Sequence, residues 1–239
     1  PLQVIRSMHE RKIIMKKILF SILIAAMAIG FAGCVQQAEP SGNDNQQEQT
    51  QKQSPKKDGK VLIAYFSRVG NFQEEDNVDA VASASVQVVD GQHEGNTKII
   101  ADMIEEETGG DLFFIEMEDK YQTDDYDGFV DSAQSEGSQG VRPTLASHVE
   151  DMESYDTIYL GFPNWWFDMP MAVYSFLEEY DLSGKTIVPF CTSGGSGFSD
   201  TLAAIKEAQP QANVTEGLHI YQDDVPSAGD EVREWLNRL

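Results

Sequence analysis

The chain has 239 residues, with 17 basic and 40 acidic side chains and a formal net charge of −23. Nucleic acid and anionic lipid surfaces repel so negative a chain, which leaves a protein or a small molecule as the expected partner. Its two cysteines are too few for a disulfide framework or a cysteine metal site. The scattered histidines show no metal-ligand spacing, so no metal site is predicted.

The N-terminal segment has the pattern of an export signal. From Met15, two lysines precede an apolar run over residues 18–31 that is short for a membrane span. The following FAGC, ending at Cys34, resembles a bacterial lipobox, in which the cysteine becomes the lipidated first residue. We expect residues 1–33 to be upstream residues and a lipoprotein signal peptide. The alternative is an ordinary cleaved signal with Cys34 incidental.

The chain then changes composition twice. Residues 34–59 are rich in Gln, Asn, Ser and charge and have almost no apolar side chains, which predicts a flexible polar tether. Residues 60–239 are numerous enough for one domain with a sizeable core. The protein is therefore expected to be exported and to contact a bacterial membrane only through a lipid anchor at Cys34.

Strand-like and helical segments alternate along the domain. KVLIAYFS from Lys60 is predicted to be a strand, and residues 96–107 a helix with an Asn-Thr cap that Gly109-Gly110 ends. Four further strands are predicted at DLFFIEM, DTIYLGF, KTIVPFC and NVTEGLHI, and three further helices at about 169–180, 199–208 and 227–239. Apolar strands each followed by a helix favour an α/β fold, a three-layer α/β/α sandwich around a five-stranded parallel sheet.

Three polar loops follow the first, third and fourth predicted strands. They are Ser67–Gly70, continued by Gly95-Asn96-Thr97 at the first helix, then Pro163–Trp166, and Cys191–Gly197. In parallel sheets of this kind ligands bind beyond the carboxyl ends of the strands, where the strand order reverses. We therefore expect the three loops to converge at one edge of the sheet.

The chemistry of the loops suits a mononucleotide. Helix N-terminal amides and the hydroxyls of Ser67 and Thr97 can donate to a phosphate. Trp165 and Trp166 offer aromatic faces, and stacking on a flat heterocycle is worth about 0.5–1.5 kcal/mol beyond area burial. The third loop offers hydroxyls, and backbone amides that its glycines leave accessible, for the polar edge of a ring system.

The motifs YFSRVGN, GNTKIIADMI, GFPNWWFDMPM and PFCTSGGSG resemble those of flavodoxin-like FMN-binding domains, especially the Trp-Trp branch found in bacterial lipoproteins. The resemblance covers essentially all of residues 60–239. It implies strand order 2-1-3-4-5 and FMN held without a covalent bond. It assigns the phosphate to Ser67, Arg68, Asn96 and Thr97, the flank of the isoalloxazine to Pro163, Asn164, Trp165 and Trp166, and its other side to Thr192, Ser193, Gly194 and Gly195.

Two features depart from the family pattern. The phosphate loop is split into Gly70-Asn71 and Gly95-Asn96-Thr97, about two dozen residues apart, and ASVQVV between them is predicted to form a small extra strand. We expect the later copy to meet the phosphate because it opens the helix. Phe167 stands where many relatives carry glycine, so the backbone has less freedom to turn there.

Three functions are compatible with this sequence. The favoured one is an FMN protein that transfers electrons outside the cytoplasmic membrane, to a redox partner protein or a small-molecule electron acceptor. It would need no catalytic acid or base, because the flavin carries the chemistry. The second is an NAD(P)H-dependent quinone or flavin reductase on the same fold, with Arg142 and Lys120 as candidate cations near the rim. The third is a flavin-free binding lipoprotein.

Overall fold

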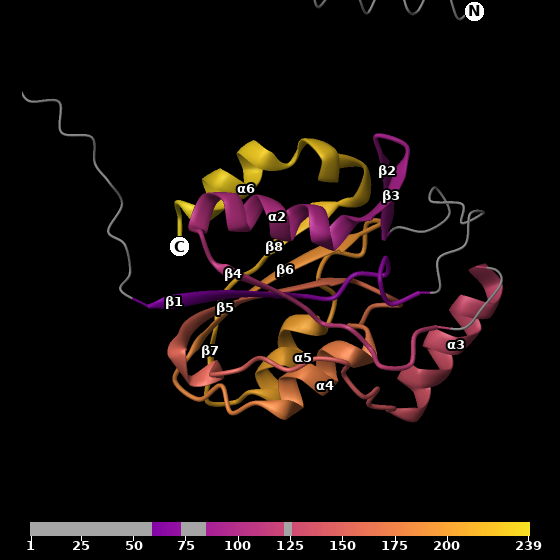
Figure 1. Ribbon diagram of the computed structural model, residues 1–239, viewed down its shortest axis with the longest axis horizontal. Coiled ribbons are helices and arrows are strands. Elements are labelled where there is room, and N and C mark those ends of the chain that lie inside the picture. The colour runs from indigo at the N-terminus through magenta and orange to yellow at the C-terminus, as the bar shows by residue number, and fades with distance from the viewer. Residues whose placement is uncertain (1–58, 73–84, 122–125) are drawn as a thin grey trace, which may run out of the picture. The chain divides into compact units, whose positions relative to one another are not determined.

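The computed structural model describes residues 59–72, 85–121 and 126–239 (Figure 1). The predicted signal segment, the lipidation site at Cys34 and the tether up to residue 58 lie outside these residues. So does part of the split loop, residues 73–84. Within the described parts of the chain, no helix is both long and apolar enough to cross a membrane.

The apolar runs of the sequence form a parallel sheet. Its strands are β1 (Lys60–Tyr65), β4 (Asp111–Phe114), β5 (Tyr155–Pro163), β6 (Thr186–Ser193), β7 (Asn213–Val214) and β8 (Leu218–Tyr221). Their order is β4-β1-β5-β6, with β7 and β8 both paired to β6, and every pairing is parallel. The predicted order 2-1-3-4-5 is confirmed.

The last strand position differs in one respect from the prediction of a single strand. β7 pairs with Thr186 and Ile187, whereas β8 pairs with β6 only from Phe190 onwards. Between these two points β6 carries Pro189, which has no N–H to donate to a ladder. The fifth strand is therefore divided into two pieces.

Helices cover both faces of the sheet because side chains alternate along each strand. In β1 and just beyond it, Leu62, Ala64 and Phe66 belong to one core cluster, and Ile63 and Tyr65 belong to the other. In Figure 1 the helices α4 (Met171–Glu179) and α5 (Thr201–Ala208) lie on one side of the sheet, and α2 (Asn96–Thr108) and α6 (Gly229–Leu236) on the other. Short 3₁₀ turns, η2 (Met152–Ser154) and η3 (Gln222–Ser227), precede β5 and α6.

The predicted first helix is confirmed as α2, but its cap differs. Ile100 and Ile104 are fully buried, and Gly109 ends the helix in the left-handed conformation with φ 67°. The N-cap residue is Gly95, without a side-chain cap, and Asn96 is already helical. The predicted Asn-Thr cap is wrong because the Thr97 hydroxyl is directed at another loop of the fold, described below.

One helix was not predicted. Residues Tyr126–Gln139 form α3, although the sequence YDGFVDSAQSEGSQ is rich in Gly and Ser, which have weak helix propensity. Its buried side chains are Phe129 and Ala133, one helical turn apart. Tertiary packing of this narrow stripe stabilises the helix despite its polar composition.

The predicted extra strand is also present, within a hairpin. β2 (Val86–Val89) pairs antiparallel with β3 (Gln92–Gly95). The two residues between them, Asp90 and Gly91, have φ values of 53° and 83°. Asp-Gly with two positive φ angles is typical of a type I′ hairpin turn, so this dipeptide was the sequence signal for the second strand. In Figure 1 the hairpin and α3 lie at the same end of the sheet.

Candidate functional site

The three predicted loops meet at the carboxyl edge of the sheet. Thr97 Oγ1, at the start of α2, lies 3.3 Å from Thr192 Oγ1 at the end of β6. The backbone N–H of Asn164 donates to the Thr192 carbonyl at 2.9 Å, and Pro163 pairs with Thr192 across the sheet. Thr97 and Thr192 are each 1% exposed, so this junction is fully enclosed.

The loop after β1 is held by Asn71 and fits closely against α2. Asn71 Nδ2 donates to the carbonyls of Ser67 (3.0 Å) and Ile115 (2.9 Å), and its Oδ1 accepts from Met117 N (2.7 Å). Ser67 Oγ lies directly against Gly95, where a Cβ atom would collide with it. Of the two partial copies of the phosphate motif, the earlier one therefore anchors the loop, and the later one opens the helix beside Ser67.

Arg68 points into a cluster of aromatic rings. Its guanidinium carbon lies 4.6 Å from the ring centroid of Phe129, 4.8 Å from that of Phe72 and 5.7 Å from that of Tyr126. Arg68 is 3% exposed, and its Nη1 atom has no hydrogen-bond partner among the described residues. Burial lowers the pKa of the guanidinium, and no carboxylate of residues 59–72, 85–121 or 126–239 forms an ion pair with it. This cation is suited to bind an anion.

The third loop is shaped by Ser193. Its hydroxyl oxygen accepts from the backbone N–H groups of Gly195 (3.2 Å) and Gly197 (3.1 Å) and lies 2.8 Å from His219 Nε2. Because the Ser193 oxygen already accepts from two backbone N–H groups, its own O–H donates to His219 Nε2. Burial lowers the pKa of His219. Gly194 and Gly195 themselves are exposed. The role of His219 could not be predicted from the sequence.

Asn164 joins the second loop to the third. Its Nδ2 donates to the Gly197 carbonyl at 2.7 Å and to Ser199 Oγ at 3.1 Å. Its Oδ1 atom is buried and accepts no hydrogen bond from residues 59–72, 85–121 or 126–239. Beside it, Cys191 is fully buried and packs as a small apolar side chain, as predicted, and burial raises the pKa of its thiol to about 12.

The two tryptophans have different environments. Trp165 packs edge-on against Phe66 (centroids 5.4 Å apart) and Phe129 (5.1 Å), and its Nε1 donates to Ser85 Oγ at 2.9 Å. Trp166 contacts the Trp165 ring but is 43% exposed. Trp165 is thus half-buried and held against the core, and Trp166 is the more exposed of the two tryptophans.

The backbone turns sharply after Trp165. Trp165 and Asp168 exchange two backbone hydrogen bonds, of 2.9 and 3.0 Å, around Trp166 and Phe167. Both central residues have positive φ, 51° and 71°, which a two-residue turn of this kind requires and which side chains with a Cβ disfavour. The expected conflict between Phe167 and the turn is therefore present as backbone strain.

Replacing Phe167 by glycine is expected to stabilise the protein. Relief of the left-handed strain outweighs the added freedom of the unfolded chain, for a net gain of about 0.5–1 kcal/mol. Little burial is lost because Phe167 is 67% exposed. Urea unfolding measures the gain, and Phe167→Ala is the control because alanine removes the ring but keeps the strain. Equal stability of both variants would contradict this account.

A cavity of about 260 Å³ lies between α3 and residues 165–171. It borders both tryptophans but none of the predicted site residues of the first and third loops, which lie elsewhere at this edge. The sequence could not indicate it, because α3 itself was not predicted.

Comparison with known proteins identifies the family. The model of the family described as Flavodoxin matches residues 85–239. This chain belongs to the flavodoxin family. No match was found among curated proteins.

Solved structures of flavodoxin-like proteins share the fold. A candidate flavoprotein from Bacteroides uniformis is 28% identical, with a TM-score of 0.57 over 75% of this chain and 98% of that one. Another, from Bacteroides eggerthii, is 26% identical, with a TM-score of 0.53 over 73% and 98%. A flavoprotein from Lactobacillus acidophilus, solved in complex with FMN, is 20% identical with a TM-score of 0.52 over 73% and 99%, which shows the fold alone.

Proposed function

We propose that this flavodoxin-family protein binds FMN without a covalent bond and carries electrons outside the cytoplasmic membrane. Export and a lipid anchor at Cys34 are part of the proposal, as is membership of the Trp-Trp branch found in bacterial lipoproteins. The family supports it, and the flavoprotein from Lactobacillus acidophilus was solved with FMN. When bound, the flavin supplies the redox chemistry, and the chain binds and orients it.

The observation that carries the proposal is a set of buried polar atoms, on two of the converging loops, that have no hydrogen-bond partner in the part of the chain that the structure describes. They are Ser67 Oγ, Arg68 Nη1 and Asn164 Oδ1. Buried polar groups in folded proteins are nearly always hydrogen-bonded, so these atoms fit a polar ligand. Two donors beside a helix start suit a phosphate, and an amide oxygen suits an N–H group of a heterocycle.

The residues of the site then have distinct roles. The Ser67 hydroxyl and the amides of α2 from Thr97 onwards would hold the phosphate, because the Asn96 N–H already donates to the Ser85 carbonyl at 2.9 Å. The Arg68 charge would balance the phosphate. Trp166 would stack on the ring system. Thr192 and Ser193 would act mainly by positioning, because their hydroxyls are engaged with Thr97 and His219.

An electron carrier is favoured over an NAD(P)H-dependent reductase because the candidate cations are neutralised. Arg142 pairs with Glu178 through Nε and Nη2, each at 2.8 Å, and Lys120 Nζ lies 2.8 Å from Glu116. Neither is left to bind the phosphates of a pyridine dinucleotide. The acidic chain instead suits a basic partner protein or an uncharged acceptor.

Titration of the purified protein with FMN tests the proposal. We expect one equivalent to bind, with quenching of flavin fluorescence. Trp166→Ala should weaken binding about tenfold, since stacking on an aromatic side chain contributes on the order of 1–3 kcal/mol per base. Trp235→Phe, on α6, is the matched control and should bind as the unmodified chain does. A protein indifferent to FMN would leave only the flavin-free binding protein.

A further inference from the structure

The cavity beside α3 is lined by no residue of the first or third loop. Ala133 and Gly137 contribute the α3 wall, and Trp165, Trp166 and Met169 contribute the opposite wall. The Trp165 ring packs between Phe66, which precedes the first loop, and Phe129 of α3. The cavity is lined by the tryptophans of the second loop but by no residue of the first or third loop, so we infer that a ligand in it would lie on the α3 side of the tryptophan pair.

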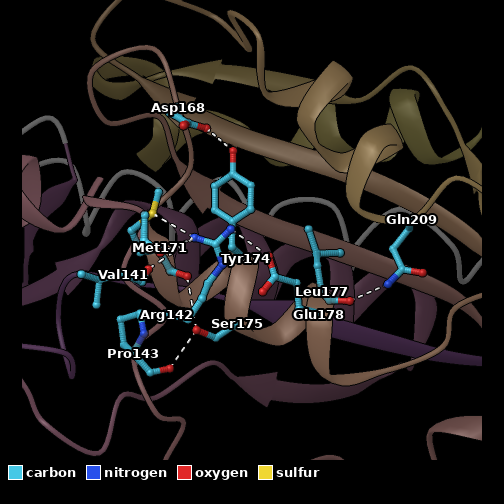
Figure 2. Close-up of polar contacts among 11 residues, drawn as sticks. Val141, Arg142, Pro143, Asp168, Met171, Tyr174, Ser175, Leu177, Glu178 and Gln209 are labelled. Carbon is cyan, nitrogen blue, oxygen red and sulfur yellow. Dashed lines mark hydrogen bonds and ion pairs between the residues drawn. The ribbon is translucent and has the colours of Figure 1, made fainter. Parts of the chain in front are cut away.

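The charged side chains near the cavity, Asp168 and Arg142, already have hydrogen-bonding or ion-pair partners. Asp168 Oδ1 accepts from Tyr174 Oη and from Met169 N, each at 2.7 Å. Figure 2 shows the Asp168–Tyr174 bond and, on the other side of the same ring, Arg142 directed at Glu178. No Lys or Arg of the described residues lines the cavity, and the Asp168 carboxylate would repel an anion. The site is thus suited to an uncharged ligand.

The volume of the cavity and the residues that line it restrict the class of ligand further. A cavity of about 260 Å³ is smaller than typical sites for drug-sized ligands, about 300–1,000 Å³, and would hold one or two rings. Two indole rings and the Met169 and Met171 thioethers offer flat, polarisable surfaces. Gln134 adds an amide N–H₂ that can donate to a carbonyl oxygen, whereas the Ser138 hydroxyl already donates to the Ser135 carbonyl at 3.0 Å.

We propose that this cavity binds an uncharged planar aromatic molecule of one or two rings bearing carbonyl groups, of which quinones are the redox-active members. One part of this proposal rests on the proposed function, namely that the bound molecule accepts electrons from a flavin on the other side of the tryptophan pair. Binding itself needs no flavin, because residues of the chain alone form the walls.

Direct binding tests the inference. 2-Methyl-1,4-naphthoquinone is added to the purified protein, with and without FMN, and bound quinone is measured by equilibrium dialysis. We expect one equivalent to bind, and 1,4-naphthoquinone-2-sulfonate, which adds a negative charge, to bind at least tenfold more weakly. Absence of quinone binding, or equal binding of both probes, would overturn the proposal.

Filling the cavity provides the matched variants. A side chain at Gly137 meets nothing within 4 Å, so Gly137→Leu can enter the cavity without disturbing α3, and Ala133→Leu fills it from the next turn. Gly229→Leu, also at an open helical position but on α6, is the control. We expect the two filling variants to bind quinone at least tenfold more weakly, and the control to bind it unchanged.

The same variants separate this inference from the proposed function. Both filling variants should retain the FMN affinity of the unmodified chain. Loss of FMN binding in them would mean that the cavity belongs to the flavin site, which overturns the inference but not the proposed function. Failure of the unmodified chain to bind FMN while it still binds quinone would overturn the proposed function alone.

Discussion

Replacing Gly95 by alanine is expected to weaken FMN binding about a hundredfold, which corresponds to roughly 2.7 kcal/mol. The added Cβ would collide with Ser67 Oγ and lie 3.0 Å from Ser67 Cβ. Either the Ser67 hydroxyl must rotate away, or the start of α2 or the loop after β1 must move. In each case the hydroxyl and the helix amides would no longer converge on one phosphate. Flavin fluorescence titration measures the loss.

Two controls identify the cause as steric. Gly229→Ala introduces the same methyl group where nothing lies within 4 Å, and it should leave FMN affinity unchanged. The double variant Gly95→Ala/Ser67→Gly removes the colliding side chain. It should recover the stability of the unmodified chain in urea unfolding but only part of the affinity, because the Ser67 hydroxyl is gone. Normal FMN affinity in the single variant would show that this close approach is not part of the site.

Replacing Arg68 by methionine is expected to have opposite effects on stability and on binding. Methionine keeps the apolar stem among Phe72, Tyr126 and Phe129 and removes a buried charge, so the ligand-free protein should gain about 1–2 kcal/mol. FMN affinity should fall about 30- to 100-fold, since a hydrogen bond from a charged donor contributes about 1.5–3 kcal/mol beside the lost charge balance.

Thermal unfolding with and without FMN measures both effects together. The unmodified chain should show a rise in Tm with FMN that follows its affinity, and in Arg68→Met this rise should be strongly reduced from a higher starting Tm. Arg233→Met is a suitable control, because this exposed arginine pairs with Glu107 far from the site. A variant that is less stable without ligand and unchanged in its response to FMN would assign Arg68 a purely structural role.

The central strands β1, β5 and β6 could be predicted because most of their side chains are buried and each strand is a nearly continuous apolar run. The loops of the site could be located because polar residues follow those runs at the carboxyl ends of the strands. The division of the last strand depends on Pro189, a residue of the neighbouring strand, and so was not visible in NVTEGLHI itself.

Contacts between segments that are distant in the sequence could not be predicted. α3 depends on Phe129 packing against Trp165, and its own composition argues against a helix. The direction of Arg68 depends on the same helix, since Phe129 and Tyr126 come from it. The different environments of Trp165 and Trp166 follow from a turn whose positive φ angles no residue type in NWWFD indicates.

The three tryptophans of the chain are divided between the two faces of the sheet. Trp235 is 5% exposed and packs against Tyr159 in the core beneath α2 and α6, whereas Trp165 and Trp166 lie at the loops and the cavity on the other side. Tryptophan fluorescence of the protein therefore contains an internal reference signal. Emission from Trp235 reports unfolding of the domain as a whole, and emission from the tryptophan pair reports events at the ligand sites. Single replacement of Trp235 by phenylalanine isolates the second signal without added dyes.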